Sequence, residues 1–458
     1  MSQLVSTTVP WFFERLQQYG SRVAIVWHGR SLTYSHLIEQ IDVWRLRFRS
    51  ESQAPGSVCG VLGDHTVDAF VAMLAAWQEG LVVTPICSLP DDRYEAYLAS
   101  AFAELVVSFT PSGDAQIERR AISGQNTLLS HFRQQSVPGL VLFSSGSTGE
   151  SKAILWNAER LIERHRAVTQ APRTLMMLRL DHIGGLNTLL YSLSGGGTIV
   201  VIAERDPVHI CSIIEKERVE LLPCSPTFLN MLLLSGAWRN FDLSSLRRIT
   251  YGTEPMSTGI LKALDDALPN VDLKQTYGLS ELGILPTKSR GRDSLWLRVG
   301  GAGFETRIHN GQLHIRTPAA MVGYLNQDNP FDAQGWFNTQ DEVEVDGDYV
   351  RILGRTSDII NVGGEKVYPA EVENVLLEAE NVLEATVCAQ HSPVTGQIVT
   401  ASVSLKHAED LRDAERRLIA FCRNRLALYQ VPMLINITTE PLHNARGKSI
   451  RRPMEHLS

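Results

Sequence analysis

Cysteine is scarce in this sequence, and no two cysteines lie close together. The chain of 458 residues has six of them, at widely spaced positions: Cys59, Cys87, Cys211, Cys224, Cys388 and Cys422. The absence of any C-x-x-C pair excludes a zinc ribbon, and the spacing is not that of a disulfide scaffold. Scattered single thiols are typical of a reducing compartment, so we expect a cytoplasmic protein.

The sequence also lacks an excess of positive charge and long apolar runs. Lys and Arg number 43 against 50 for Asp and Glu, a net charge of −7, so we expect no nucleic-acid partner. The most apolar stretch, residues 70–89, is interrupted by Glu79, Gly80 and Pro85, and it falls short of the roughly 20 apolar residues of a membrane helix. Residues 1–9 show no signal-peptide pattern. We therefore expect no membrane span, whereas the composition indicates neither a function nor an oligomeric state.

Helical and strand patterns alternate over most of the chain. Residues 67–77 carry apolar side chains at helical spacing, and short apolar runs at 81–83, 140–143 and 198–202 are typical of strands. Short apolar strands between helices favour an α/β fold with parallel sheets.

The pattern changes after residue 306, where a β-rich subdomain is expected. Asn310-Gly311 and residues 346–348 each lie between two strand patterns and predict hairpins. Farther on, a helix is expected from Pro369, a strand at 385–387 and a helix over 411–429. The last helix has one apolar face, made of Leu411, Ala414, Leu418, Phe421, Cys422 and Leu426. The pattern places a domain boundary near 355–358, which leaves a small C-terminal domain of α+β character.

The strongest local pattern is S-S-G-S-T-G-E-S-K, which runs from Ser144 to Lys152 directly after an apolar run. Glycines and small hydroxyl residues let a backbone wrap a phosphate, and the lysine adds positive charge. The glycine spacing differs from that of the P-loop G-x-x-x-x-G-K-[ST]. Taken alone, the pattern fits either a phosphate-binding loop or a flexible turn.

This loop resembles the signature loop of the adenylate-forming superfamily, which includes acyl-CoA synthetases, adenylation domains and luciferases. Ser151 stands where that family usually has proline. Further motifs follow in the family order. They are Y-G-L-S-E at 277–281, G-W-F-N-T-Q-D at 335–341 with Gln340 in place of the usual glycine, the hinge and crossover motif within 354–373, and the closing motif at 444–448. Weaker matches lie at 32–34 and 252–255. The resemblance covers residues 20–452, and the chain is identified as similar to AMP-dependent acyl-CoA synthetases. The resemblance implies a large N-terminal domain of stacked, mostly parallel sheets at 1–354 and a small, mobile α+β C-terminal lid at 358–458, with a hinge near 355–358.

The resemblance implies a reaction in two halves. A carboxylate attacks the α-phosphate of ATP to give acyl-AMP and pyrophosphate, and a thiol then displaces AMP. The implied cofactors are ATP, Mg²⁺ and coenzyme A, or the phosphopantetheine of an acyl carrier protein in place of coenzyme A. The substrate is a small-molecule carboxylic acid. Apolar residues between the motifs, around 226–230 and 282–285, favour an aryl or acyl acid.

The resemblance also implies a role for individual residues. Lys448 would be the mobile catalytic lysine, Ser280 a donor to the α-phosphate, Glu281 the Mg²⁺ ligand and His182 a histidine near the acyl pocket. ATP and the thiol arm would be bound by Ser144, Ser145, Gly146, Ser147, Thr148, Gly149, Lys152, Gly252, Thr253, Glu254, Tyr277, Gly278, Asp341, Arg355, Gly363 and Gly364. Within this set, Tyr277 would lie against adenine, Asp341 would accept from the ribose hydroxyls, and the two glycines at 363 and 364 would line the thiol tunnel.

Each of these residues also has an ordinary structural interpretation. Ser280 would fit a helix N-cap, Asp341 a turn, and Lys448 a solvated basic tail. Three other functions stay open: loading of a carrier protein, a luciferase-like oxygenase, and an inactive nucleotide-binding homologue. Retention of Lys448, Glu281 and Asp341 argues against the last.

Overall fold

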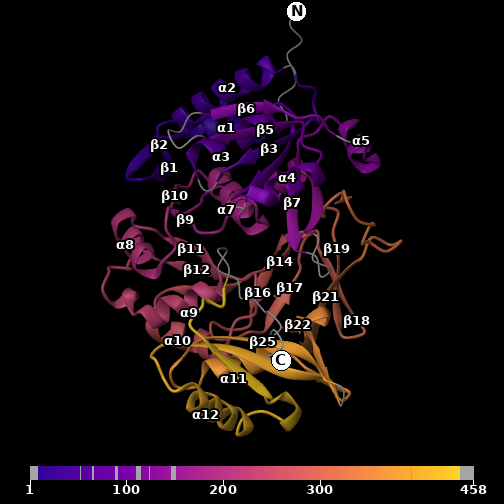
Figure 1. Cartoon of the computed structure of the whole chain (residues 1–458). Coiled ribbons are helices and arrows are strands. Elements are labelled where there is room, and N and C mark those ends of the chain that lie inside the picture. Colours follow the sequence, from indigo (N-terminus) through magenta and orange to yellow (C-terminus); the bar gives the residue numbers. More distant parts are fainter. Residues whose placement is uncertain are drawn as a thin grey trace, which may run out of the picture.

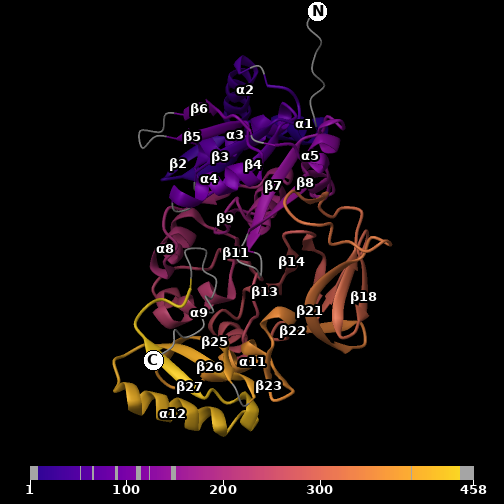
Figure 2. The same cartoon turned by 45° about the vertical axis from the view of Figure 1, so that its right-hand side comes forward.

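The computed structural model describes residues 9–51, 53–63, 66–87, 91–109, 115–122, 124–145, 151–392 and 395–443. Figure 1 shows two stacked sheets with their helices above a smaller C-terminal domain, and a β-rich region at one side. Figure 2 shows the same arrangement from a second direction. The predicted α/β class, with a large N-terminal domain and a small α+β C-terminal domain, is confirmed.

The first seven-stranded sheet, which we call sheet I, has the order β20-β8-β7-β4-β3-β5-β6. Its central strands are parallel, and its edge strands are antiparallel. The strands are β20 (Gly323–Tyr324), β8 (Ser151–Asn157), β7 (Gly139–Ser145), β4 (Val82–Ile86), β3 (Val58–Leu62), β5 (Leu105–Phe109) and β6 (Ala115–Arg119). β4 continues through Pro85, where the sequence pattern predicts its end.

The second seven-stranded sheet, sheet II, has the order β13-β12-β11-β9-β10-β1-β2 and is parallel except at β2. Its strands are β13 (Asp272–Gln275), β12 (Arg248–Tyr251), β11 (Leu221–Cys224), β9 (Thr174–Met176), β10 (Ile199–Val201), β1 (Val23–Trp27) and β2 (Arg30–Thr33). Strands buried on both faces are typical of such parallel sheets.

Helices cover both sheets in layers. Between them lie α1 (Pro10–Tyr19), α2 (Tyr34–Ser50), α3 (Val67–Gln78), α6 (Ala158–Glu163) and α7 (Ile183–Ser194), which share one apolar core with both sheets. α4 (Asp91–Ser100) and α5 (Thr127–Arg133) pack on the outer face of sheet I. α8 (Pro207–Glu217), α9 (Pro226–Ser235) and α10 (Thr258–Ala267) pack on the outer face of sheet II.

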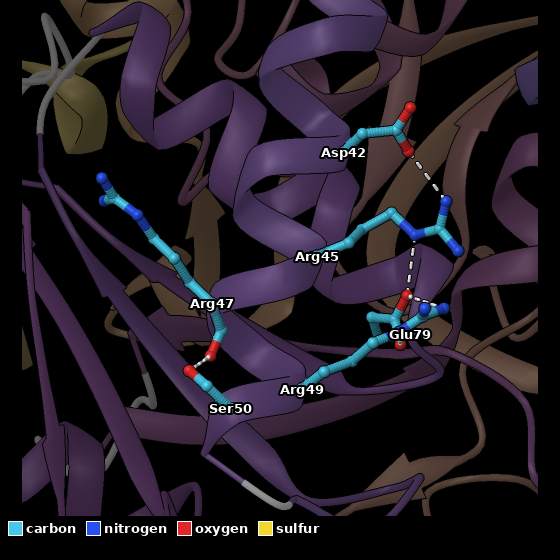
Figure 3. Close-up of polar contacts among 6 residues, drawn as sticks. All are labelled: Asp42, Arg45, Arg47, Arg49, Ser50 and Glu79. Carbon is cyan, nitrogen blue, oxygen red and sulfur yellow. Dashed lines mark hydrogen bonds and ion pairs between the residues drawn. The ribbon is translucent and has the colours of Figure 1, made fainter.

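Buried charge reinforces the contact between α2 and the end of α3. Glu79 follows α3 directly, and its carboxylate accepts from Nε of Arg45 at 2.7 Å and from Nε of Arg49 at 2.8 Å (Figure 3). Asp42 accepts a further hydrogen bond from Arg45. The Glu79 side chain is only 9% exposed, so its charge depends on these two arginines for compensation.

The β-rich region is an antiparallel sheet with the order β16-β17-β22-β21-β19-β18. Its strands are β16 (Thr287–Ser289), β17 (Leu297–Val299), β22 (Tyr349–Arg355), β21 (Phe337–Asp346), β19 (Gln312–Arg316) and β18 (Glu305–His309). A separate pair, β14 (Tyr277–Leu279) and β15 (Gly283–Leu285), lies nearby in the chain. The predicted hairpin at Asn310-Gly311 is confirmed, and both residues have the positive φ that a tight hairpin turn needs.

The C-terminal domain packs two helices on a five-stranded sheet. Its elements are β23 (Ile360–Val362), β24 (Glu365–Val367), α11 (Pro369–Leu377), β25 (Val382–Ser392), β26 (Gly396–Leu405), α12 (Leu411–Arg423) and β27 (Leu434–Thr438). Short 3₁₀ turns lie at Ala237–Arg239, Thr356–Asp358 and Leu428–Gln430.

The prediction for the last helix is partly wrong. The helix ends at Arg423 rather than near 429, because the backbone turns there and both Arg425 and Leu426 donate their N–H groups to the carbonyl of Cys422. Leu411, at the first position of the helix, is 61% exposed and is not part of the buried face. In the described ranges, none of the helices has the length and apolarity to cross a membrane.

Candidate active site

The predicted functional residues gather at the carboxyl edge of sheet II. His182, Gly252 and Tyr277 lie in the segments that follow β9, β12 and β13, and Pro226 follows β11. The carboxyl ends of parallel strands meet at one edge of a sheet, where α/β proteins bind their ligands. Two adjoining cavities, of about 400 Å³ and about 130 Å³, open at this edge.

The larger cavity, which we call the nucleotide cavity, lies between the body of the protein and the C-terminal domain. The body contributes Gly252, Thr253, Glu254, Tyr277, Gly278, Asp341 and Arg355, all of which the sequence predicts as nucleotide-binding residues. The C-terminal domain contributes Glu373, Glu384, Thr386 and Leu442. The set of residues that line the cavity would therefore change if the C-terminal domain rotated relative to the body.

Tyr277, Asp341 and Arg355 form a polar group in this cavity. The Tyr277 hydroxyl donates to Oδ2 of Asp341 at 2.5 Å, and Nε of Arg355 lies 3.5 Å from Oδ1. Burial raises the pKa of Asp341, while the hydrogen bond from Tyr277 and the charge of Arg355 oppose that rise. Asp341 lies inside strand β21 opposite Arg355 in β22, so the interpretation as a turn residue is wrong.

The backbone beside these residues adopts conformations that explain two sequence features. Gln340 has a φ of 61°, a left-handed conformation that favours glycine, and it stands where the resembling family has glycine. Its carbonyl accepts from the Thr356 hydroxyl at 3.0 Å, and its N–H donates to Asn338, which compensates for the missing glycine. At Gly252 a Cβ atom would lie 2.5 Å from Oγ1 of Thr276, so a side chain would not fit there.

Glu281 is a buried carboxylate held by one tyrosine. The Tyr324 hydroxyl donates to Oε1 of Glu281 at 2.9 Å, and the side chain of Lys152 lies over the same ring, with Nζ 5.3 Å from its centroid. A hard carboxylate oxygen suits Mg²⁺, which proteins usually hold through one or two carboxylates together with phosphates. Across the described ranges, no three His, Cys, Asp or Glu side chains cluster as a metal site.

Ser280 and Glu281 lie in the turn between β14 and β15, and the helix N-cap interpretation of Ser280 is wrong. The Ser280 carbonyl accepts from Nε1 of Trp156 at 2.9 Å, which fixes the turn to strand β8 of sheet I. Lys152 lies on β8 as well. One strand therefore positions both the turn and the lysine.

The smaller cavity, which we call the acyl pocket, lies at the N-terminus of α7. His182 is the N-cap of that helix, and its Nδ1 accepts from the backbone N–H of Gly184 at 3.0 Å. The neutral imidazole therefore carries its proton on Nε2. The acyl pocket shares walls with the nucleotide cavity at Gly252, Thr253, Thr276, Gly278, Leu279 and Arg355. An acyl group and a nucleotide would thus meet at Gly252 and Gly278.

Other predicted residues lie elsewhere or outside the described ranges. Ser144 faces Lys152 across β7 and β8, and the backbone of Ser145 pairs with that of Ser151. Glu254 accepts the N–H of Thr227 at the start of α9. Gly363 and Gly364 form an exposed turn between β23 and β24 and line neither cavity in this domain orientation. Gly146, Ser147, Thr148, Gly149 and Lys448 lie outside the described residues.

A cluster that the sequence did not indicate joins the body to the C-terminal domain. Glu342 accepts from Nζ of Lys366 at 2.8 Å and from the hydroxyl of Tyr368 at 2.5 Å. Burial raises the pKa of Glu342, but these two hydrogen bonds outweigh it and hold the pKa below its ordinary value. We call Glu342, Lys366 and Tyr368 the interdomain clamp. The sequence could not predict this cluster, because the two partners of Glu342 follow it by 24 and 26 residues and lie in another domain.

A second contact holds the chain just before the closing motif. Glu384 of β25 accepts the backbone N–H of Leu442 at 3.0 Å, and its Oε1 lies 2.5 Å from Nδ1 of His443. Glu384 and Leu442 both line the nucleotide cavity. Glu384 therefore holds residues 442–443 beside this cavity.

Comparison with known proteins agrees with this architecture. The sequence matches the model of the AMP-binding enzyme family over residues 12–325 and that of the AMP-binding enzyme C-terminal domain over 371–448. It is 27% identical to a feruloyl-CoA synthase of Amycolatopsis, with 96% of this chain and 97% of the relative covered. It is 31% identical to an indoleacetate–CoA ligase of Aromatoleum aromaticum, with 68% and 65% covered.

Solved structures share the fold at low sequence identity. An anthranilate CoA ligase in complex with anthranoyl-AMP matches with a TM-score of 0.80 at 19% identity, covering 96% of this chain and 95% of the other. An o-succinylbenzoate CoA synthetase from Bacillus subtilis matches with a TM-score of 0.77 at 21% identity, with 96% of each chain covered. The predicted resemblance is confirmed: the chain belongs to the AMP-binding enzyme family, in which it is an AMP-forming enzyme of the acyl-CoA synthetase type.

Proposed function

We propose that this enzyme converts a carboxylic acid to its acyl-adenylate with ATP and then transfers the acyl group to the thiol of coenzyme A. The observation that carries the proposal is the shared wall between the two cavities. It brings a site for an acyl group beside a site with the polar groups that a nucleotide needs. Named relatives that join aryl acids to coenzyme A support the same choice of acceptor.

The first half-reaction brings two anions together, so positioning and positive charge are the main contributions of the protein. We assign Asp341 and Arg355 to the ribose, Tyr277 to the adenine and Lys152 to the phosphates. Mg²⁺, held by Glu281, would neutralise charge on the phosphates. Ser280, which lines the acyl pocket, would donate to the α-phosphate, and Lys448 would bridge the attacking carboxylate and that phosphate.

The second half-reaction needs a route for the thiol arm. We propose that the C-terminal domain turns about a hinge at residues 355–358, where a 3₁₀ turn at Thr356–Asp358 joins β22 to β23. Such a rotation would remove Leu442 and the other C-terminal-domain residues from the wall of the nucleotide cavity. It would bring the exposed turn of Gly363 and Gly364 toward that cavity. One site could then serve both half-reactions.

The test measures both half-reactions separately. Acid-dependent exchange of pyrophosphate into ATP reports adenylation, and product analysis with either coenzyme A or a phosphopantetheinylated carrier protein identifies the acceptor. Transfer only to the carrier protein would overturn coenzyme A as the acceptor. Oxygen consumption without thioester would indicate the luciferase-like alternative.

Lys448→Ala tests the assignment of the catalytic lysine. We expect a loss of roughly 10²–10³ in adenylation rate, the usual cost of one transition-state contact, with thioester formation from preformed acyl-AMP largely retained. Lys406→Ala, at an exposed position of the same domain, is the matched control. Equal loss in both half-reactions would contradict the assigned role.

A further inference from the structure

The acyl pocket is small for a substrate site. Its volume is about 130 Å³, whereas pockets for drug-sized ligands measure roughly 300–1,000 Å³. An apolar cavity of about 150 Å³ engineered into another protein accepts one benzene molecule. The pocket therefore has room for a group about as large as one six-membered ring.

The core of the protein sets this limit. Ile183, Thr188 and Cys224 line the pocket and are each less than 10% exposed. Cys224 ends strand β11 within the core of sheet II, and α7 is enclosed between the two sheets. Enlarging the pocket on this side would displace packed side chains, and close-packed interiors resist such shifts.

Of the apolar side chains that the sequence suggested for the pocket, Ile284 lines it, and most of the others lie elsewhere. Leu282 and Leu285 belong to the core between the sheets, and Phe228 and Leu229 belong to the core under sheet II. The lining is instead partly polar. Asn187 of α7 lies four residues after Ile183, on the same face of the helix, and it lines the pocket. Within the described part of the chain, its amide makes no hydrogen bond.

The neighbouring hydroxyl is already engaged. Thr188 donates to the carbonyl of Gly184 at 2.8 Å, one turn back along α7. The Asn187 side chain is half-buried, so water can reach its amide in the empty pocket. A substrate that displaces this water must supply a hydrogen-bond partner in its place, or the buried amide loses free energy.

We infer that the substrate is a carboxylic acid whose acyl part is at most one six-membered ring and carries a hydroxyl, keto or amino group facing Asn187. This inference rests on the proposed function, because it concerns the same site. It separates this chain from relatives named for two-ring, phenylpropenoic or long-chain acids.

The experiment is acid-dependent ATP–pyrophosphate exchange with a graded panel. The panel contains benzoate, 3-hydroxybenzoate, 4-hydroxybenzoate, 2-aminobenzoate, cinnamate, 2-naphthoate and decanoate. We expect the highest kcat/KM with a substituted single-ring acid. For acids larger than the pocket, kcat/KM should be roughly 10-fold to 200-fold lower, which is the usual discrimination for small changes in fit to an apolar wall.

Three variants connect the preference to the pocket. Asn187→Leu keeps the volume and removes the amide, so the preference for substituted over unsubstituted benzoate should fall at least about 10-fold. Ile284→Ala enlarges the pocket wall on β15, and cinnamate or 2-naphthoate should gain relative to the single-ring acids. Ile213→Ala removes the same atoms from α8, which lines neither cavity, and the size preference should not change.

The outcomes distinguish the inference from the proposed function. Exchange confined to the two-ring, phenylpropenoic or long-chain acids overturns the substrate class and leaves the proposed function standing. Unchanged preference in both Asn187→Leu and Ile284→Ala also overturns the substrate class. If none of the acids supports exchange while circular dichroism shows a folded protein, the proposed function is overturned, and the substrate class with it.

Discussion

Replacing Glu342 by glutamine should release the C-terminal domain from the orientation seen here. Glu342 belongs to the body, and its two partners in the interdomain clamp, Lys366 and Tyr368, belong to the C-terminal domain. Glutamine keeps the size of the side chain but removes the charge. The change therefore weakens this interdomain contact while leaving the fold of each domain intact.

The magnitude follows from the two contacts. A hydrogen bond to a charged group contributes about 1.5–3 kcal/mol, and the 2.5 Å contact from Tyr368 to a carboxylate that is 10% exposed belongs to that class. The Lys366 side chain is 59% exposed, so its ion pair contributes only about 0–1 kcal/mol. A loss of about 2 kcal/mol would shift the balance between domain orientations roughly 30-fold.

The assay compares the half-reactions under single-turnover conditions. The present orientation holds His443, next to the closing motif, beside the nucleotide cavity, so its loss should slow adenylation by up to roughly 30-fold. Thioester formation from preformed acyl-AMP should not slow. Limited proteolysis should also cleave the 355–358 segment faster in the variant.

Matched variants isolate the clamp. Glu305→Gln changes a glutamate of the same sheet, but Glu305 pairs with Arg316 of the adjacent strand β19 within the body, so neither half-reaction should change. Tyr368→Phe should act in the same direction as Glu342→Gln, and the two effects should be less than additive. Equal slowing of both half-reactions, or unchanged proteolysis, would refute the reasoning.

Two further predictions concern the metal and stability. Tyr324→Phe removes the hydrogen bond that orients Glu281, and the Mg²⁺ concentration for half-maximal exchange should rise roughly 10-fold, as for other outer-shell partners. Tyr349→Phe, outside both cavities, is the control, and an unchanged Mg²⁺ titration would contradict the assignment. Burial, and then the charge of Arg164, lower the pKa of His165 to about 4, so the folded state resists its protonation. The contribution of the neutral His165 to the free energy of unfolding should therefore be fully present above about pH 6.5. It should be lost as the pH falls toward 4, by up to about 1.4 kcal/mol per pH unit. Chemical denaturation at several pH values gives the free energy of unfolding as a function of pH. Below about pH 6.5 its slope should be shallower in His165→Gln than in the wild-type protein, and equal slopes would contradict this prediction.

The sequence was sufficient to predict the fold because its signals are local. A hairpin at Asn310-Gly311 depends on two residues that adopt positive φ, and the helix at Pro369 begins with a residue suited to its first turn. Residues that follow parallel strands meet at one edge of the sheet, but only the family resemblance indicated which of them form the site. Tyr277, Asp341 and Arg355 line one cavity, where Tyr277 and Asp341 bond to each other, and the roles that the resemblance implies for them stay predictions.

Contacts that depend on long-range packing could not be predicted. Tyr324 reaches Glu281 because strand β20 joins the edge of sheet I next to β8, an arrangement that no local pattern encodes. The apolar residues at 282–285 indicated a pocket wall, but burial assigns Leu282 and Leu285 to the core. Periodicity identifies an apolar face without identifying what that face contacts.

Strand β21 links the nucleotide site to the domain orientation. Neighbouring residues of a strand point to opposite faces, so Asp341 faces Tyr277 in the cavity while Glu342 faces Lys366 and Tyr368 of the C-terminal domain. The register of β21 is irregular directly after Glu342, and Gln340 before it has a left-handed backbone. A displacement of Asp341 by a bound ribose would therefore be transmitted over one peptide bond to the carboxylate that holds the C-terminal domain. Under the proposed function, binding of a nucleotide at Asp341 would thereby change the orientation of the C-terminal domain, and with it the half-reaction that the site favours.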